Sequence, residues 1–328
     1  MTAPLLAVRD WRVGFRAERG VVVAVDGVGF DLPAGGALGV VGESGSGKSA
    51  LAMSLLRLLP AGGVLLGGSA RFAGADLAAM PDRDLRRIRG RRIAVVFQDP
   101  MTSLNPYMRV GAQVAEPLVA HLGMGRRAAR LRAVALLESV GIPEPARSAA
   151  KFPHELSGGQ RQRAMIAMAL GCDPELLIAD EPTTALDVTV QAQVLALIRR
   201  ERERRGMGLI LISHNLAVVA GMCERVAVMY GGRMVEVGAA QTIFRAARHP
   251  YTRGLIGALP RLDDERGRPL ASIPGNPPAA GGDRAGCAFA PRCPSAQERC
   301  RVVAPEERAA EGTTLRCHVD LPPMGEGP

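Results

Sequence analysis

Short apolar segments alternate with amphipathic stretches along the first 240 residues. Strands are predicted at residues 21–28, 37–41, 93–97, 176–179 and 208–213, and as a hairpin at 226–230 and 234–237 around Gly231–Gly232. Helices are predicted at residues 50–59, 126–139, 161–170 and 188–205, with Asp187 as the cap of the last. This alternation predicts an α/β fold in which helices cover both faces of a parallel sheet.

The pattern changes near Pro250. From Arg261 onward the chain is rich in proline and glycine and holds four of the six cysteines. This indicates a small appended region that cannot bury a large core of its own. The whole chain of 328 residues suffices for about two domains. No apolar run approaches the roughly 20 residues of a membrane-spanning helix. No secretory signal is visible, so a cytoplasmic location is expected.

The chain has 47% hydrophobic and 22% charged residues, which excludes wholesale disorder. Its net charge of +9 would suit a nucleic-acid-binding protein, but two details argue against that function. Only Lys48 and Lys151 are lysines, so arginine is a general bias, and aromatic residues make up only 3%. A solvated basic surface, or attraction to anionic lipids beside a membrane partner, explains the charge equally well.

A glycine-rich motif, GESGSGKS, follows the strand at 37–41 and precedes a helix. It comprises Gly42, Glu43, Ser44, Gly45, Ser46, Gly47, Lys48 and Ser49, with Ala50 next. Glycines let backbone N–H groups approach phosphate oxygens, and the helix N-terminus adds partial positive charge. We expect Lys48 to reach the β- and γ-phosphates of ATP, and Ser49 to bind Mg²⁺.

Two acidic residues, Asp180 and Glu181, follow the strand at 176–179. A carboxylate in this position suits Mg²⁺, so Asp180 is expected to hold the metal directly or through water. Glu181 would then orient and polarise the attacking water, because phosphoryl transfer needs mainly positioning and charge neutralisation. An ordinary strand-to-loop boundary is the alternative for this pair taken alone.

A second glycine-containing turn, LSGGQ at 156–160, opens the helical stretch at 161–170. Ser157, Gly158, Gly159 and Gln160 together form a candidate anion-binding surface. One γ-phosphate cannot need two distant surfaces of the same chain, so we expect two chains to face each other, each presenting this turn to the nucleotide of the other. The alternative is a flexible loop with a capped helix.

These motifs occur in the order seen in the ATP-binding cassette (ABC) ATPases, which the chain resembles over about residues 5–245. The resemblance implies an N-terminal antiparallel β region and a helical subdomain at about 100–165 within a nucleotide-binding domain at 1–248, followed by a tail at 249–328. It also implies that Gln98 senses Mg²⁺ and the γ-phosphate and couples to the transmembrane partner, and that Asp187, in the ALD motif at 185–187, helps to organise the dimer interface. His214 would contact the γ-phosphate and the attacking water.

The same resemblance places Phe15 where an aromatic side chain stacks on adenine. Phe15 could instead be a core residue, with Trp11 as a nearby rival. A rival class, soluble ABC ATPases acting on DNA or ribosomes, usually has a coiled-coil insertion or two cassettes in one chain, and neither is present. A nucleotide sensor without turnover is disfavoured by Glu181.

Two further motifs, QDPMTSLNP at 98–106 and HPYTRGL at 249–255, resemble the oligopeptide/dipeptide importer ATPases, as does the cysteine pattern of the tail. The resemblance implies peripheral attachment to the cytoplasmic face of the membrane, under two permease subunits. It further implies an extracytoplasmic peptide-binding protein, pairing with a second, different ATPase subunit, and no nucleic-acid partner.

Four tail cysteines, Cys287, Cys293, Cys300 and Cys317, have the spacing C-x5-C-x6-C-x16-C. Stable disulfides are disfavoured in a cytosolic protein, so metal binding is the natural alternative. The close pairs of a structural zinc site are absent, and loosely spaced thiolates suit a [4Fe–4S] cluster better, as in family members that carry one. Zinc and free thiols remain open, as does His318 as a substitute ligand. Cys172 and Cys223 are expected to be core residues.

Overall fold

A computed structural model of the chain describes residues 3–18, 20–184, 186–259, 272–278, 285–319 and 321–322. Ala185 and parts of the tail predicted at 249–328 therefore lie outside the described residues. The chain divides into two compact units. The first consists of residues 1–3, 33–36 and 79–211, and the second of residues 4–32, 37–78 and 212–328. No helix within the described ranges is long and apolar enough to cross a membrane.

The first unit combines buried strands with many helices. Its strands lie in the order β8-β7-β6, of which β6 and β7 are parallel with Ile93 opposite Leu176. The strands are β6 (Ile93–Val96), β7 (Leu176–Asp180) and most of β8 (Gly208–Ser213). Its helices are α2 (Asp82–Ile88), α3 (Pro100–Ser103), α4 (Val110–Leu122), α5 (Arg126–Ser139), α6 (Pro145–Ala149), the 3₁₀ turn η1 (Pro153–Glu155), α7 (Gly158–Leu170) and α8 (Val188–Arg205).

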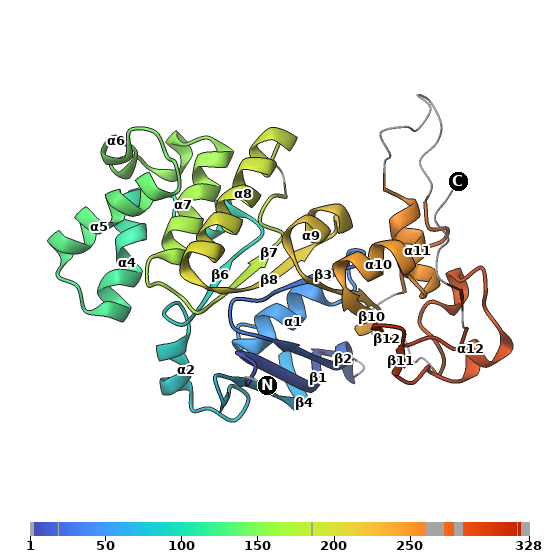
Figure 1. Cartoon of the computed structure of the whole chain (residues 1–328). Coiled ribbons are helices and arrows are strands. Elements are labelled where there is room, and N and C mark those ends of the chain that lie inside the picture. The colour runs from blue at the N-terminus through green and yellow to red at the C-terminus, as the bar shows by residue number, and fades with distance from the viewer. Residues whose placement is uncertain are drawn as a thin grey trace. The chain divides into compact units, whose positions relative to one another are not determined.

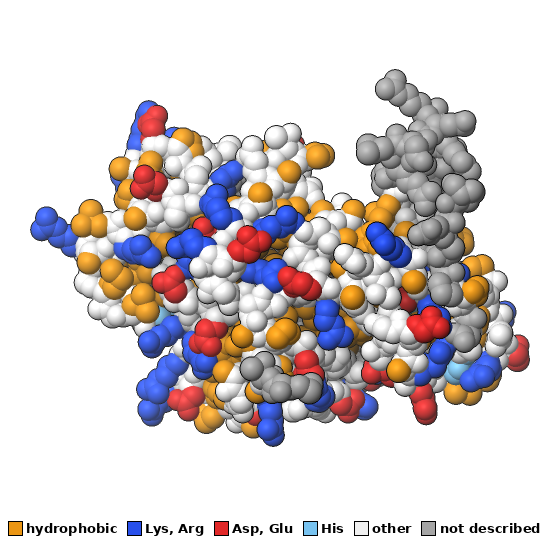
Figure 2. Space-filling model, viewed as in Figure 1, with side chains coloured by type: hydrophobic (Ala, Val, Ile, Leu, Met, Phe, Trp, Pro, Cys, Tyr) orange, Lys and Arg blue, Asp and Glu red, His pale blue; other side chains and the backbone are white. Residues whose placement is uncertain are grey.

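Helices α4, α5 and α7 pack against one another and form the green cluster in Figure 1. The buried face of α5 carries Ala129, Ala133, Leu136 and Leu137 at helical spacing, whereas its arginines are exposed. On the visible face in Figure 2, basic side chains are interspersed with acidic ones rather than gathered into one stripe.

The second unit contains a four-stranded antiparallel sheet in the order β2-β1-β4-β5. The strands are β1 (Leu6–Ala17), β2 (Gly20–Leu32), β4 (Gly63–Phe72) and β5 (Ala75–Asp76). Helix α1 (Lys48–Leu55) contacts β1 and β2. The side chain of Trp11 is fully buried there, and its Nε1–H donates to Ser54 Oγ at 2.8 Å. This contact ties the helix that follows the glycine-rich motif to the antiparallel sheet.

The same unit holds strands in the order β11-β12-β10-β9-β3, of which β3 and β9 are parallel. The strands are β3 (Ala37–Val41), β9 (Arg225–Tyr230), β10 (Arg233–Ala239), β11 (Arg308–Ala310) and β12 (Thr313–Leu315). The helices are α9 (Leu216–Met222), α10 (Ala240–Ala246), α11 (Pro250–Gly257), the 3₁₀ turn η2 (Ala290–Arg292) and α12 (Glu298–Val302). The tail is thus anchored by strand pairing to β10 (Figure 1).

Most predicted elements are present, several with unchanged bounds. The hairpin is confirmed, with positive φ angles of 55° at Gly231 and 86° at Gly232. The predicted strand at 21–28 is longer, as β2. The prediction of a helix at 50–59 was wrong at both ends, since α1 begins at Lys48 and ends at Leu55. Arg57 has a φ of 51°, in the left-handed region, which ends the helix before Pro60.

We expect Trp11→Ala to lower the free energy of unfolding by about 3–5 kcal/mol, because it empties a large buried site and leaves Ser54 without its donor. Urea denaturation followed by circular dichroism measures the change. Tyr107→Ala is the matched control, since the Tyr107 side chain is 90% exposed. Equal loss of stability in the two variants would contradict this description of the core.

Candidate nucleotide site

The glycine-rich motif forms the loop between β3 and α1 in the second unit. A Cβ atom on Gly42 would collide with the carbonyl oxygen of Met229, and one on Gly47 with that of Ala24. Gly47 also has a φ of 100°, in the left-handed region. The loop backbone lies directly against β9 and β2, and for this reason only glycine fits at these two positions. Helix α1 begins at Lys48, so the positive end of its dipole lies at this loop.

The ammonium of Lys48 is buried beneath this loop. Its Nζ donates to the carbonyl oxygens of Gly42 at 2.8 Å and Glu43 at 2.9 Å, and to Ser46 Oγ at 3.3 Å. Ser46 is buried, whereas Ser44, Gly45 and Ser49 are exposed and Ala50 is partly exposed. The exposed side of the loop, with a cation directly behind it, is a surface suited to phosphate.

Glu181 and two polar neighbours form a second group, in the first unit. Gln98 Nε2 donates to Glu181 Oε2 at 3.1 Å, and Thr184 Oγ1 donates to the same oxygen at 2.8 Å. Glu181 has a φ of 45°, an uncommon conformation for a residue with a side chain and one that recurs at functional sites. The neighbouring Asp180 ends β7 and is buried. The structure therefore brings Gln98 to the carboxylate predicted as the catalytic base.

His214 belongs to the second unit. It is exposed and lies between β8 and α9, whose N-cap is Asn215. Asn215 Oδ1 accepts from the N–H groups of Ala217 and Val218, and the Asn215 N–H donates to Ser213 Oγ at 3.0 Å. The residues on both sides of His214 are therefore fixed by hydrogen bonds, while the imidazole lies at the surface.

The LSGGQ turn forms the start of α7. Ser157 Oγ accepts from the Gln160 N–H at 3.3 Å, and Gln160 Oε1 accepts from the Ser157 N–H at 3.0 Å, so the two residues form a reciprocal capping box. A Cβ on Gly159 would crowd Val190 of α8. Asp187 caps α8 as predicted, accepting from the Val190 N–H at 2.9 Å. The turn and Asp187 thus lie close together in the first unit.

The two aromatic candidates differ in exposure. Trp11 is fully buried, so it has no face for a ligand, whereas Phe15 near the end of β1 is partly exposed. Phe15 lies opposite Val22 of β2. The prediction that Phe15 stacks on adenine stays open, and Trp11 is excluded as its rival.

The four tail cysteines are free thiols in the second unit. Burial raises the pKa of Cys287 and Cys293, and raises that of Cys317 to about 11. The charge of neighbouring cysteines raises each of these pKa values further. The Cys287 N–H donates to the Cys300 carbonyl oxygen at 2.7 Å, so these two residues are neighbours. Within the described ranges, however, no three or more His, Cys, Asp or Glu side chains are arranged to hold a metal. Four cysteines are the right residue type to bind a metal as thiolates. The described side chains are not, however, arranged as a complete set of metal ligands. Cys172 and Cys223 are buried core residues as expected.

The HPYT segment forms a buried network at the start of α11. His249 Nδ1 accepts from the Tyr251 N–H at 3.0 Å, and the Glu236 carboxylate accepts from the N–H groups of Arg248 and His249. The rings of Tyr251 and Tyr230 lie 4.5 Å apart, centroid to centroid, and Phe289 packs against both. This aromatic cluster joins α11, β9 and the cysteine-containing tail.

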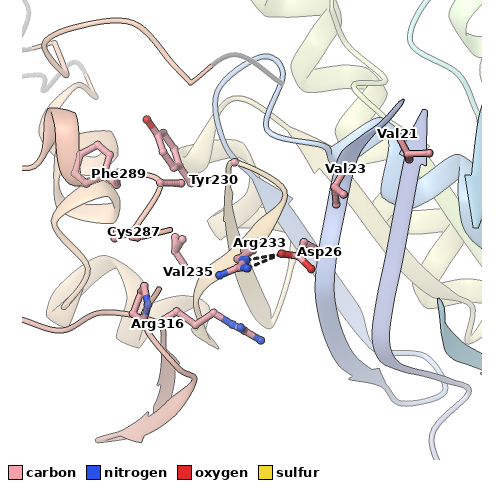
Figure 3. Close-up of a pocket in the computed structure, with 13 residues that line it drawn as sticks. Val21, Val23, Asp26, Tyr230, Arg233, Val235, Cys287, Phe289 and Arg316 are labelled. Atoms are coloured by element: carbon pink, nitrogen blue, oxygen red, sulfur yellow. Dashed lines mark hydrogen bonds and ion pairs between the residues drawn. The ribbon is translucent and has the colours of Figure 1, made fainter. Parts of the chain in front are cut away.

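A cavity of about 400 Å³ lies beside this cluster, between β2, the β9–β10 hairpin and the tail (Figure 3). Its lining includes Val21, Val23, Tyr230 and Cys287, and the Arg233 guanidinium pairs with Asp26 at 2.6 Å on one wall. Phe15 is not part of the lining.

Comparison with known proteins identifies the class. A family model described as ABC transporter matches residues 25–184, and one described as oligopeptide/dipeptide transporter, C-terminal region, matches residues 235–300. The glycine-rich loop at Lys48 and the carboxylates at the end of β7 both lie within the first match. The chain is an ABC ATPase.

Similarity to curated proteins extends over almost the entire chain. The oligopeptide transport ATP-binding protein OppD of Salmonella typhimurium is 50% identical over 95% of this chain and 93% of its own length. OppD of Escherichia coli is also 50% identical, over 95% of this chain and 92% of its own. A putative peptide import ATP-binding protein of Brucella abortus is 50% identical over 98% and 96%. The chain belongs to this family of oligopeptide transporter ATP-binding proteins.

Solved structures support the same fold. A dimeric ATP-binding cassette in a post-hydrolysis state, bound to ADP and Pi, is 26% identical, with a TM-score of 0.65 over 72% of this chain and 98% of that one. CbiO1 of Clostridium perfringens, part of the ABC transporter complex cbiONQ, is also 26% identical. Its TM-score is 0.62 over 74% of this chain and 91% of that one. The predicted α/β ABC ATPase fold is confirmed.

Sequence reasoning missed two partners of the site. Thr184 contacts Glu181 from three residues further along the chain, and only its position in EPTT gave a signal. Arg292 binds Glu43 from 249 residues away, and no local pattern indicates that pair.

The buried imidazole of His249 gives a prediction for the pH dependence of stability. Burial lowers the pKa of His249 to about 3, whereas the unfolded chain takes up a proton near pH 6.5. Unfolding therefore binds a proton, and the free energy of unfolding falls as pH drops from about 6.5 towards 3, by up to about 1.4 kcal/mol per pH unit. His249→Asn removes this contribution.

Urea denaturation of the parent and of His249→Asn at about pH 7.5 and about pH 5 gives the change in the free energy of unfolding with pH for each protein. The two changes are then compared. Burial raises the pKa of Glu236, which acts in the opposite direction but is present in both proteins. Parallel pH dependence in the two proteins would contradict a neutral buried His249.

Proposed function

We propose that this chain hydrolyses ATP to power the import of peptides through a membrane permease. The observation that carries the proposal is 50% identity with oligopeptide transport ATP-binding proteins over 95% of the chain, together with the intact motifs at Lys48, Asp180 and Glu181. The similarity also includes residues 235–300, which match the C-terminal region described for oligopeptide/dipeptide transporters.

In this proposal the loop of Gly42–Ser49 binds the phosphates through backbone N–H groups, and Lys48 turns from the loop carbonyls to the β- and γ-phosphates. Phe15 stacks on adenine. Ser49, Gln98 and Asp180 would hold Mg²⁺, which would supply charge neutralisation for the triphosphate. Their oxygen atoms are the ligand type that Mg²⁺ prefers.

Glu181 then accepts a hydrogen bond from the attacking water and orients it in line with the γ-phosphate, and His214 contacts the γ-phosphate and that water. The hydrogen bonds from Gln98 and Thr184 support this role, because they hold one oxygen of the Glu181 carboxylate in place.

We further propose that two ATPase chains work together, as the dimeric ADP-bound cassette does. Ser157, Gly158, Gly159 and Gln160 of one chain contact the nucleotide bound by the other, with Asp187 at the interface. The partner is a second, related ATPase rather than an identical copy. The pair lies on the cytoplasmic face of the membrane beneath two permease subunits, which receive peptides from an extracytoplasmic binding protein; no nucleic acid takes part.

For the tail, we propose that Cys287, Cys293, Cys300 and Cys317 hold a [4Fe–4S] cluster, with zinc as the alternative metal. Four free thiols in one short region support this proposal. Burial raises the pKa of Cys287, Cys293 and Cys317, and a bound cation would offset that cost by stabilising the thiolate forms. The group would supply metal–thiolate bonds to a segment with little apolar area.

Glu181→Gln is expected to lower ATP turnover by at least about 100-fold, since it removes a general base while keeping the shape of the side chain. ATP binding persists, so two subunits remain closed around ATP. Phosphate release by the complex purified from membranes measures turnover, and bound nucleotide measures trapping. Glu138→Gln, on the exposed face of α5, is the control. Turnover at the parental rate in Glu181→Gln would exclude this base.

Protein purified without oxygen is expected to be brown and to contain iron and acid-labile sulfide in equal amounts. Replacing the four tail cysteines with serine abolishes both, whereas Cys172→Ser, a change in the core of the first unit, retains them. Colourless protein with stoichiometric zinc selects the alternative metal. Protein with neither metal contradicts a metal-binding tail.

A further inference from the structure

Glu43, inside the phosphate-binding loop, is held by side chains from the C-terminal part of the chain. Its N–H donates to the hydroxyl of Tyr251 at 2.8 Å. Its two carboxylate oxygens accept from the Arg292 guanidinium at 2.6 and 2.9 Å. Its carbonyl oxygen accepts from Lys48 at 2.9 Å. One residue of the loop is thus fixed at four atoms, three of them by residues more than 200 positions away.

Arg292 is suited to this task because all its donors are used. Nε donates to Pro274 O, Nη1 to Glu43 and the Tyr230 hydroxyl, and Nη2 to Glu43 and Ile273 O. Its side chain is 5% exposed. The hydrogen bonds to Glu43 raise the pKa of Arg292, so it remains charged. A guanidinium that donates two parallel hydrogen bonds to a carboxylate fixes both the position and the orientation of that carboxylate.

Tyr251 is also fixed by several contacts. Its ring packs against Tyr230 and Phe289 in the aromatic cluster, and its N–H is bound by His249. Figure 3 shows Tyr230 and Phe289 lying next to each other at the edge of the cavity. Phe289 and Arg292 both come from the short stretch 287–293, which begins and ends with a cysteine of the tail.

A negative charge in a loop that binds a triphosphate opposes the ligand, and it does so over about 8–10 Å. Arg292 neutralises this charge. We propose that Arg292 and Tyr251 are positioning residues for the phosphate loop: they hold Glu43, neutralise its carboxylate, and so set the affinity for ATP from the cysteine-containing tail. This inference rests on the proposed function, because it concerns the same nucleotide site.

The alternative is that Arg292 only attaches the tail. The two readings differ in what happens when the charge of Glu43 is removed. If Arg292 acts by neutralising and orienting Glu43, its loss matters only while Glu43 is charged. If Arg292 only attaches the tail, through its hydrogen bonds to Pro274, Tyr230 and Ile273, its loss matters equally in both backgrounds.

The experiment is a double-mutant cycle on the full-length chain with its partners, using the dissociation constant of Mg·ATP and the KM and kcat of hydrolysis. Arg292→Ala is expected to weaken ATP binding about tenfold, with a larger change in KM than in kcat. In the Glu43→Gln background the same substitution is expected to change the affinity less than about threefold. Arg292→Lys, which keeps the charge but not the fork, recovers part of the loss.

Arg301→Ala, an exposed arginine of α12, is the matched control and should bind ATP like the parent. An equal loss of affinity from Arg292→Ala in both backgrounds, or none in either, overturns the inference. If Arg292→Ala does not fold, the comparison of Arg292→Lys in the two backgrounds decides in the same way. A parent chain that does not bind ATP overturns the proposed function instead, before any variant is compared.

Discussion

The phosphate loop depends on a close approach between backbones. Residues 42 and 47 can lie against Met229 and Ala24 only because neither has a Cβ atom. This close approach fixes the path of the loop, with the buried side chain of Lys48 beneath it. Any side chain at these two positions would push the loop from the strands that support it, and the N–H groups would no longer converge on phosphate.

The loop is also held from its other side, by residues that come late in the chain. The tail contributes the strand β12 next to β10 with β11 beyond it, an aromatic cluster around Tyr251, and the Arg292 fork on Glu43. The described part of a segment that is short of apolar residues is therefore held by strand pairing and by the ion pair of the buried Arg292 with the partly buried Glu43. Because truncating one partner of such a pair leaves a buried charge, the tail and the loop stabilise each other.

The sequence predicted the strands and the nucleotide motifs because both are local patterns. The strand at 37–41 and the helices at 126–139 and 188–205 have the predicted bounds, since glycine, proline and capping residues mark their ends. The end of α1 was missed because it depends on the conformation of Arg57, which has no sequence signal. The contact between Arg292 and Glu43 was missed because it depends on tertiary structure rather than on spacing. The cysteines were predicted as a set, but their arrangement depends on how the tail folds onto β10.

The most direct test of this account is a structure of the membrane-extracted complex with a bound, non-hydrolysable ATP analogue. The account predicts that Lys48 of this chain contacts the γ-phosphate of one nucleotide, while its Ser157 contacts the γ-phosphate of the nucleotide held by the partner ATPase. A complex in which Ser157 lies far from every nucleotide would contradict it.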